Sequence, residues 1–232
     1  MNFNELKEKC RENNIELSDD QISKLDKYAD FLVEYNEKIN LTAITDKEEI
    51  IEKHFYDSIL FTFNRDMHKT LVDVGTGAGF PGVVCKIVYP ELKVILVETL
   101  NKRCIFLNEL INLLELKDIE VVNSRGEDFA RNNREKYDYV TARAVTNLSN
   151  LIEICGAMVK VNGYFIALRG LSGSQEIEDS KQAIKTMGFT IEETSELHLT
   201  DGSTRIISFF KKNTLTSKKY PRQYSIIKKR PL

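Results

Sequence analysis

Residues 71–82, with the sequence LVDVGTGAGFPG, constrain the fold of this chain more than any other segment. The apolar, β-branched residues predict a buried strand that leads directly into glycines, and a helix pattern follows. Glycine is needed where a backbone turns sharply or lets a ligand approach closely. Amides at the start of the following helix favour a polar or anionic ligand. We therefore expect this glycine loop, residues 75–82, to bind a ligand rather than form a plain strand–helix turn.

Short β-branched runs alternate with helical patterns after residue 70. This alternation predicts βαβ units around a parallel sheet, and the last two strands suit an antiparallel edge hairpin. The predicted strands are residues 70–74, 93–97, 119–123, 137–142, 164–168, 189–193 and 205–210, and the predicted helices between them are residues 83–88, 102–114, 148–159 and 176–187. We therefore expect an α/β fold with a mostly parallel seven-stranded sheet flanked by helices.

The first 65 residues predict an N-terminal helical extension. Ser18 and Gln21 form a capping-box pattern, and Asp46 with Glu49 opens a second helix that runs towards Leu60. The apolar stripe that follows the capping box comprises Ile22, Leu25, Ala29, Leu32, Tyr35 (or Asn36) and Ile39. We expect a helical region over residues 1–65, a catalytic domain over residues 66–212 and a tail over residues 213–232.

Composition and spacing exclude several classes of protein. The four cysteines form no CxxC pair, and the three histidines are equally scattered, so we expect reduced thiols and no metal site. No apolar run approaches the roughly 18 residues of a membrane span, and the polar N-terminus has no apolar core of a signal peptide. We expect a cytoplasmic monomer that does not enter a membrane.

The C-terminal tail is strongly basic. Residues 211–232 carry eight Lys and Arg and no acid, so the remainder of this chain of net charge −2 carries −10. Such a tail either solubilises the chain or binds phosphates. The phosphate-binding interpretation assigns RNA contacts to six residues, which are Lys218, Lys219, Arg222, Lys228, Lys229 and Arg230.

The glycine loop matches two ligand-binding patterns. Residues 77–82 fit the dinucleotide fingerprint G-x-G-x-x-G, which is a weak signal alone. The spacing of Gly75, Gly77 and Gly79 gives G-x-G-x-G, with Asp73 two residues earlier. A carboxylate at Asp73 would repel a pyrophosphate but would attract the ammonium and sulfonium charges of S-adenosylmethionine. These four residues therefore favour S-adenosylmethionine over NAD.

Two further acidic positions fit a bound nucleoside. Glu98 ends the second predicted strand, where a carboxylate can accept hydrogen bonds from both ribose hydroxyls. Residues 124–129, SRGEDF, follow the third strand, and the carboxylate of Glu127 or Asp128 could accept from an adenine amino group.

Five separated segments closely resemble one family, the RsmG (GidB) small-subunit ribosomal RNA guanine-N7 methyltransferases. The segments are the loop DVGTGAGFPG at 73–82, NLTAI at 40–44 with HFYDS at 54–58, ETLNKR at 98–103 with FL at 106–107, TARA at 141–144, and KYPR at 219–222 with the final PL. The resemblance spans residues 30 to 232. It implies a class I Rossmann-like methyltransferase that acts on 16S ribosomal RNA or the small ribosomal subunit.

The resemblance also implies individual cofactor contacts, which are at Gly75, Phe80, Gly126, Glu127 and Arg143. The chain departs from the family pattern at three places. Glu98 and Thr99 replace the usual Asp-Ser, Gly126 replaces the usual Ala, and the tail lacks the usual Gly-Thr-Pro. We expect a backbone contact at Gly126 to tolerate that change.

The chemistry of guanine N7 predicts a sparse site. N7 has an in-plane lone pair and no proton, so attack on the sulfonium methyl needs no general base, and alignment supplies the rate. Residues 142–145, ARAV, replace the Asn/Asp-Pro-Pro-aromatic motif of exocyclic-amine methyltransferases. Arg143 is the one catalytic candidate, and it could equally pair with a helix carboxylate.

Other functions remain open on the sequence alone. An NAD(P)-dependent oxidoreductase would need a polar catalytic set such as Tyr-x-x-x-Lys, which the sequence lacks. A non-enzymatic RNA-binding protein would not need both Asp73 and Glu98. A methyltransferase for another RNA, a protein or a small molecule is a third alternative.

Overall fold

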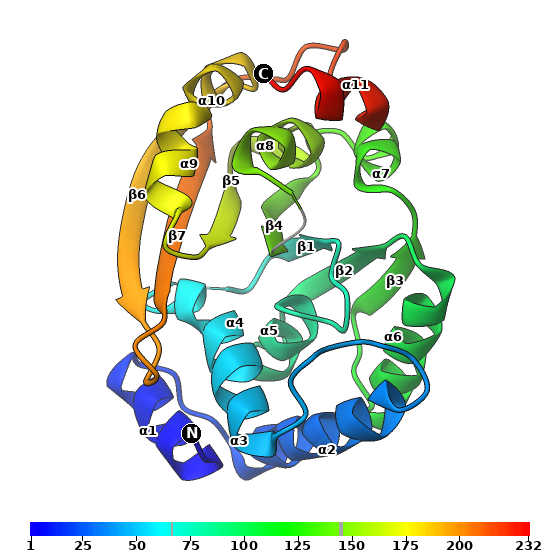
Figure 1. The fold of residues 1–232 in the computed structure, drawn as a ribbon, viewed down its shortest axis with the longest axis vertical. Coiled ribbons are helices and arrows are strands. Elements are labelled where there is room, and N and C mark those ends of the chain that lie inside the picture. Colours follow the sequence, from blue (N-terminus) through cyan, green and yellow to red (C-terminus); the bar gives the residue numbers. More distant parts are fainter. Residues whose placement is uncertain (66, 144–145) are drawn as a thin grey trace. The chain divides into compact units, whose positions relative to one another are not determined.

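The structure is a computed structural model that describes residues 1–65, 67–143 and 146–232. Its strands form a seven-stranded sheet in the order β3-β2-β1-β4-β5-β7-β6 (Figure 1). The chain groups into two compact units, residues 1–69 with 76–123 and residues 70–75 with 124–232. The expected mostly parallel sheet is confirmed, while the expected division at residues 65 and 212 stays a prediction.

Unit 1 contains the N-terminal helices and two strands. Strands β2 and β3 are parallel, with Val94 opposite Ile119 and Glu98 opposite Asn123. Helix α6 packs on both strands, and α2 packs on α5 and α6. The elements are α1 (Phe3–Glu12), α2 (Asp19–Asn36), α3 (Lys47–Ile50), a π-helix η1 (Ile51–Tyr56), α4 (Asp57–Ile59), a 3-10 turn η2 (Leu60–Thr62), α5 (Gly82–Val88), β2 (Lys93–Glu98), α6 (Asn101–Leu113) and β3 (Ile119–Asn123).

Helix α2 begins as the capping box predicts. The Ser18 side chain accepts from the Gln21 amide, and the Gln21 side chain accepts from the Ser18 amide. The side-chain Nε2 of Gln21 also donates to the carbonyls of Ile87 and Val88, so this cap ties α2 to the end of α5. The helix ends at Asn36, three residues before Ile39, the last member of the expected stripe.

The second N-terminal helix differs from its expectation. It begins as predicted, because the Asp46 side chain accepts from the Glu49 amide at 2.9 Å. From Ile51 to Tyr56 the backbone is a π-helix instead of an α-helix. A π-helix inserts an extra residue into a helical turn, which re-aims the side chains, and such insertions recur at functional sites.

Unit 2 contains the other five strands. β1 and β4 are parallel, as are β4 and β5, whereas β7 is antiparallel to both β5 and β6, which confirms the predicted hairpin. Helix α8 packs on β4 and β5, α9 on β7 and α10 on β6. The elements are β1 (Thr70–Val74), α7 (Gly126–Asn132), β4 (Tyr137–Arg143), α8 (Leu148–Gly156), β5 (Val159–Arg169), α9 (Gly173–Asp179), α10 (Lys181–Thr186), β6 (Phe189–His198), β7 (Thr204–Lys212) and α11 (Tyr224–Lys229).

Two helix predictions in unit 2 are wrong in extent. The helix expected over residues 148–159 ends at Gly156, and Val159 already begins β5. The helix expected over residues 176–187 is two helices, because the backbone amide of buried Ser180 closes α9 by donating to the Ile177 carbonyl, and Ser180 then begins α10. No helix in the described part of the chain is both long and apolar enough to cross a membrane.

A buried lysine fixes the point at which the tail leaves the sheet. Lys212 ends β7, and its ammonium donates to the carbonyls of Gly156 and Met187 at 2.9 and 2.6 Å and to the Thr216 hydroxyl. The same contacts tie the last turns of α8 and α10 together. Burial lowers the pKa of Lys212 to about 8.

The lowered pKa of Lys212 predicts a pH-dependent stability. Between about pH 8 and the ordinary lysine pKa, the unfolded chain binds a proton that the folded chain has released, so stability rises with pH. The free energy of unfolding of the wild type, measured by urea denaturation, should increase relative to that of Lys212→Met by up to about 1.4 kcal/mol per pH unit. Lys218→Met, at an exposed position of the tail, is the control that should leave this slope unchanged. Parallel curves for wild type and Lys212→Met would contradict the assignment.

Candidate cofactor site

The glycine loop turns through three left-handed residues. Gly75, Gly77 and Gly79 have φ angles of 70°, 63° and 102°. Residues that carry a side chain rarely adopt this left-handed conformation. At Gly79 a Cβ would also lie 2.7 Å from the Tyr28 hydroxyl and 2.7 Å from Val83 Cγ2. The glycines therefore serve both the turn and the close packing behind it.

Helix α2 supports the loop from within unit 1. The buried Tyr28 hydroxyl donates to the Ala78 carbonyl at 2.5 Å, and the Tyr28 ring stacks on Phe80 at 5.4 Å between centroids. Phe80 is buried, so its side chain fixes the loop from this side. The apolar stripe expected on α2 passes through Ala29 and omits Tyr28. The amphipathic pattern predicts which face of the helix is buried. It cannot predict that the Tyr28 hydroxyl bonds to a carbonyl far along the chain.

The π-helix brings a further ring, that of His54, onto Phe80. The two rings stack with centroids 4.4 Å apart. His54 Nδ1 lies 3.1 Å from the Lys53 carbonyl, which can only accept, so Nδ1 carries a proton, and Nε2 lies 2.9 Å from the Thr42 hydroxyl. Both ring nitrogens thus have polar partners that hold the ring. Thr42 and His54 lie in the motif segments 40–44 and 54–58, but the spacing of these segments assigned no role to either residue.

Glu98 holds the middle of the glycine loop. Its carboxylate is 3 % exposed, and Oε2 accepts from the Gly77 amide at 3.0 Å. The other oxygen, Oε1, accepts from the Leu100 amide at 2.8 Å and from the Thr99 hydroxyl at 3.2 Å. Arg103 approaches Oε2 at 3.7 Å, beyond hydrogen-bond distance.

This geometry limits what Glu98 can still accept. A carboxylate offers about four lone-pair positions. The three hydrogen bonds occupy both positions of Oε1 and one of Oε2. One position on Oε2 is left for a ligand, unless the Thr99 hydroxyl turns away. Glu98 is expected from the sequence to accept from both ribose hydroxyls. This geometry leaves an acceptor position for one of them.

The first carboxylate of the motif lies in unit 2. Asp73 is fully buried on β1, opposite Thr141 of β4. Burial raises the pKa of the Cys155 thiol, and the charge of Asp73 raises it further, which places that charge near α8. Gly75 follows two residues later at the end of the same segment of unit 2.

Helix α7 begins at Gly126, which is tightly packed against its neighbours. At Gly126 a Cβ would lie 2.8 Å from both Ile154 Cγ2 and Val74 Cγ1, so these branched neighbours leave no room for the alanine usual in the family. Glu127 is 6 % exposed, and its Oε1 accepts from Arg125 Nε at 2.9 Å. The smaller residue at 126 is therefore required here rather than merely tolerated.

Arg143 is the last residue of β4 and is half-buried. It is paired across the sheet with Leu168 of β5. Residues 144–145, which complete the TARA and ARAV segments, lie outside the described part of the chain.

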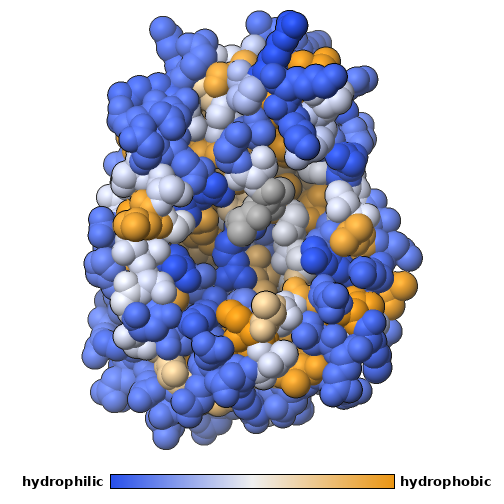
Figure 2. Space-filling view, in the orientation of Figure 1, coloured by the Kyte–Doolittle hydropathy of each residue, from blue (hydrophilic) through white to orange (hydrophobic). Residues whose placement is uncertain are grey.

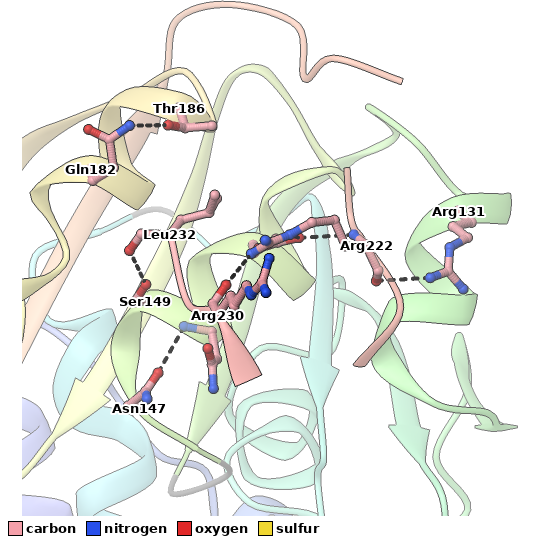
Figure 3. Close-up of polar contacts among 10 residues, drawn as sticks. Arg131, Asn147, Ser149, Gln182, Thr186, Arg222, Arg230 and Leu232 are labelled. Atoms are coloured by element: carbon pink, nitrogen blue, oxygen red, sulfur yellow. Dashed lines mark hydrogen bonds and ion pairs between the residues drawn. The ribbon is translucent and has the colours of Figure 1, made fainter. Parts of the chain in front are cut away.

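The basic tail is docked on unit 2. Arg222 donates from its backbone amide and from Nε to Glu153 Oε1 at 2.9 and 2.8 Å, and its Nη2 lies 2.6 Å from Oε2 (Figure 3). Glu153 is fully buried in α8, so this pair is a structural anchor. Arg131 and Arg134 donate to backbone carbonyls of the tail, including those of Arg222 and Thr216. The remaining basic residues of the expected RNA-binding set are exposed, namely Lys218, Lys219, Lys228, Lys229 and Arg230.

The structure thus gathers the predicted cofactor residues in two groups. Unit 1 places Gly77, Gly79, Phe80 and Glu98 around one loop. Unit 2 places Asp73 on β1, Gly75 directly after it, and Gly126 with Glu127 at the start of α7. Tyr28, His54 and Arg125 are additional residues that the sequence patterns did not assign.

Comparison with solved structures supports the methyltransferase fold. Precorrin-6y C5,15-methyltransferase from Geobacter metallireducens aligns with a TM-score of 0.54 at 13% identity, over 75% of this chain and 92% of its own. TYW2 of M. jannaschii, solved in complex with AdoMet, aligns with a TM-score of 0.56 at 14% identity, over 68% of this chain and 75% of its own. At these identities the likeness concerns the fold alone.

Comparison with sequences identifies the family. The model of GidB, rRNA small subunit methyltransferase G, matches residues 21–206. Ribosomal RNA small subunit methyltransferase G of Lysinibacillus sphaericus is 45% identical over 100% of both chains, and that of Staphylococcus carnosus is 45% identical over 98% of this chain and 97% of its own. The expected resemblance is confirmed, and the NAD(P)-dependent oxidoreductase is not supported. The chain belongs to the GidB family, the ribosomal RNA small subunit methyltransferase G family, and so to the S-adenosylmethionine-dependent methyltransferases.

Proposed function

We propose that this chain transfers the methyl group of S-adenosylmethionine to N7 of a guanine in 16S ribosomal RNA. The class of enzyme and its cofactor follow from the family, whose curated members are named for the small ribosomal subunit. The observation that carries the proposal is the left-handed glycine loop with the Gly77 amide bound to the Glu98 carboxylate. This loop can approach a ligand closely, and it is anchored by the acid that ends the next strand.

The proposed cofactor contacts follow the chemistry of each part of S-adenosylmethionine. Asp73 and the backbone of Gly75 face the cationic methionine portion. The open position on Glu98 Oε2 accepts one ribose hydroxyl. The backbone at Gly126 and the carboxylate of Glu127 meet the adenine, whose amino group is a donor.

Phe80, Gly79 and Arg143 complete the proposed set. The Phe80 ring, which stacks on the rings of Tyr28 and His54, gives the loop a rigid apolar wall. The missing side chain at Gly79 lets the backbone approach the ligand and leaves room for Tyr28. Arg143 is the candidate for contact with the cofactor carboxylate, an RNA phosphate or the guanine.

The proposed reaction is direct in-line transfer. The N7 lone pair attacks the sulfonium methyl, the carbon–sulfur bond breaks, and the products are N7-methylguanine and S-adenosylhomocysteine. No proton leaves N7, so no general base is required. The imidazole of His54 holds Thr42 and Lys53 with its two nitrogens, which suits a positioning role rather than proton transfer.

The substrate assignment is tested by methyl transfer to RNA. Tritiated S-adenosylmethionine is incubated with the protein and bare 16S RNA, small subunits or assembled ribosomes, and the digested RNA is analysed by nucleoside chromatography. The proposal expects label in 7-methylguanosine at one position. Label in another nucleoside, or in RNA of the large subunit alone, would refute it. Transfer to a small molecule alone would support a different substrate class.

A matched pair of glycine substitutions tests the cofactor site. Gly75→Val places a branched side chain in the proposed methionine site, and we expect it to weaken S-adenosylmethionine binding by more than about tenfold in calorimetry. Gly202 has a similar φ of 81° with open space around it, so Gly202→Val imposes the same backbone strain elsewhere. That variant should bind the cofactor normally. Equal affinity of a folded Gly75→Val protein would contradict the assignment.

The absence of a general base predicts a flat pH profile. In single-turnover experiments with bound RNA, the rate of methyl transfer should vary by less than about twofold between about pH 6 and pH 9. The fold is checked at each pH by circular dichroism. A tenfold rise that follows one ionisation near neutrality, with the fold intact, would show that a base takes part.

A further inference from the structure

Helix α11 and the start of α7 enclose a surface pocket. The pocket has a volume of about 680 Å³ and is lined by Arg125, Glu127, Tyr224, Ser225, Lys228 and Lys229. All six residues belong to unit 2. In Figure 2 the surface around α10 and α11 is mostly hydrophilic. The volume lies within the range of small-molecule sites, about 300–1,000 Å³, so it is sufficient for one nucleotide.

The pocket has an excess of positive charge. Three cations line it, and its one carboxylate, Glu127, is buried and already bonded to Arg125. The side chains of Lys228 and Lys229 are exposed and make neither an ion pair nor a hydrogen bond within the described residues. The ligand that matches this set is an anion, since two ammonium groups are left to bind it.

The pocket also offers an aromatic surface. The Arg125 guanidinium lies 5.1 Å from the ring centroid of half-buried Tyr224. Nucleobases stack on tyrosine rings and on guanidinium planes, and such stacking tolerates any base. An anion-binding group beside a stacking surface matches a nucleotide better than a free phosphate.

The tail holds this pocket in a fixed shape. The Arg222–Glu153 pair ties the segment before α11 to α8, and Arg222 Nη2 also donates to the Arg230 carbonyl at the end of α11. The Ser149 hydroxyl donates to the carbonyl of the last residue, Leu232 (Figure 3). Because both ends of α11 are anchored, little conformational entropy is lost when a ligand binds.

We propose that this pocket binds one nucleotide of an unpaired RNA segment, with its phosphate on Lys228 and Lys229 and its base against Tyr224 and Arg125. The inference rests on the proposed function, because it takes RNA as the substrate. An unpaired segment is required since a base within a duplex has no face exposed for stacking. The pocket shares Glu127 with the proposed adenine contacts, so the RNA would be held beside the cofactor.

Fluorescence anisotropy with a labelled single-stranded RNA 12-mer of mixed sequence tests the pocket. Lys228→Ala/Lys229→Ala should weaken binding and flatten the dependence of log affinity on log salt by about 0.7, the value for one phosphate contact in single strands. Tyr224→Ala should weaken binding by about tenfold, whereas Tyr224→Phe keeps the ring and should bind normally. Every variant should retain its affinity for S-adenosylhomocysteine, which also verifies folding.

A matched pair elsewhere in unit 2 provides the control. Lys181→Ala/Lys185→Ala on α10 removes the same charge and should leave the salt slope near that of the wild type. Equal losses from both lysine pairs would show diffuse attraction and overturn the proposal, as would unchanged RNA binding in the Lys228/Lys229 and Tyr224→Ala variants. If Tyr224→Ala weakens S-adenosylhomocysteine instead of RNA, the pocket belongs to the cofactor and the proposal is wrong. The anisotropy experiment measures binding and not methyl transfer. RNA that binds in this pocket but is never methylated would therefore refute only the proposed function.

Discussion

The hydrogen bond from the Gly77 amide to the Glu98 carboxylate is the contact on which the glycine loop depends. Three left-handed glycines at alternate positions turn the loop, and a buried carboxylate is a strong acceptor for the Gly77 amide at its centre. The carboxylate is in turn oriented by the Leu100 amide and the Thr99 hydroxyl. One acid therefore both shapes the loop and retains a single acceptor position for a ligand.

The N-terminal helices complete this support from the other side. Tyr28 binds the Ala78 carbonyl, and the π-helix re-aims the chain so that His54 stacks on Phe80. The ring contacts of Tyr28, His54 and Phe55 with Phe80, together with the Tyr28 hydrogen bond, thus connect residues before position 60 with the turn at 78–80. In unit 2 the Arg222–Glu153 pair anchors the basic tail. The anchored tail lies beside Arg125, whose guanidinium faces the Tyr224 ring.

Much of the fold was predictable because its local signals agree. The alternation of strands and helices, the capping box at Ser18 and the final hairpin all follow from periodicity and end signals, and the structure confirms them. The π-helix was not predictable, since its residues keep an ordinary helical composition. The end of α8 at Gly156 depends on Lys212, which lies 56 residues later and caps that carbonyl. A contact between residues so far apart in the sequence cannot be predicted from a local pattern.

The candidate site was predictable to a similar degree. Motif spacing located Asp73, the glycines, Glu98 and Glu127, because these residue types are dictated by local backbone and ligand chemistry. Spacing could not show that three hydrogen bonds already occupy Glu98, or that Ile154 and Val74 exclude a side chain at Gly126. Nor could it distinguish Arg222, which is used internally, from Lys228 and Lys229, which remain exposed.

The central claim, that the one open acceptor position of Glu98 binds a ribose hydroxyl, is tested by a double-mutant cycle. S-adenosylhomocysteine and its 2′-deoxy and 3′-deoxy analogues are titrated by calorimetry into the wild type and into Glu98→Gln. Removal of one of the two hydroxyls should cost the wild type about tenfold in affinity, and the same removal should cost Glu98→Gln much less, because the charged acceptor is gone. Identical losses in the two proteins for both analogues would show that Glu98 only supports the loop, and would contradict this account of the site.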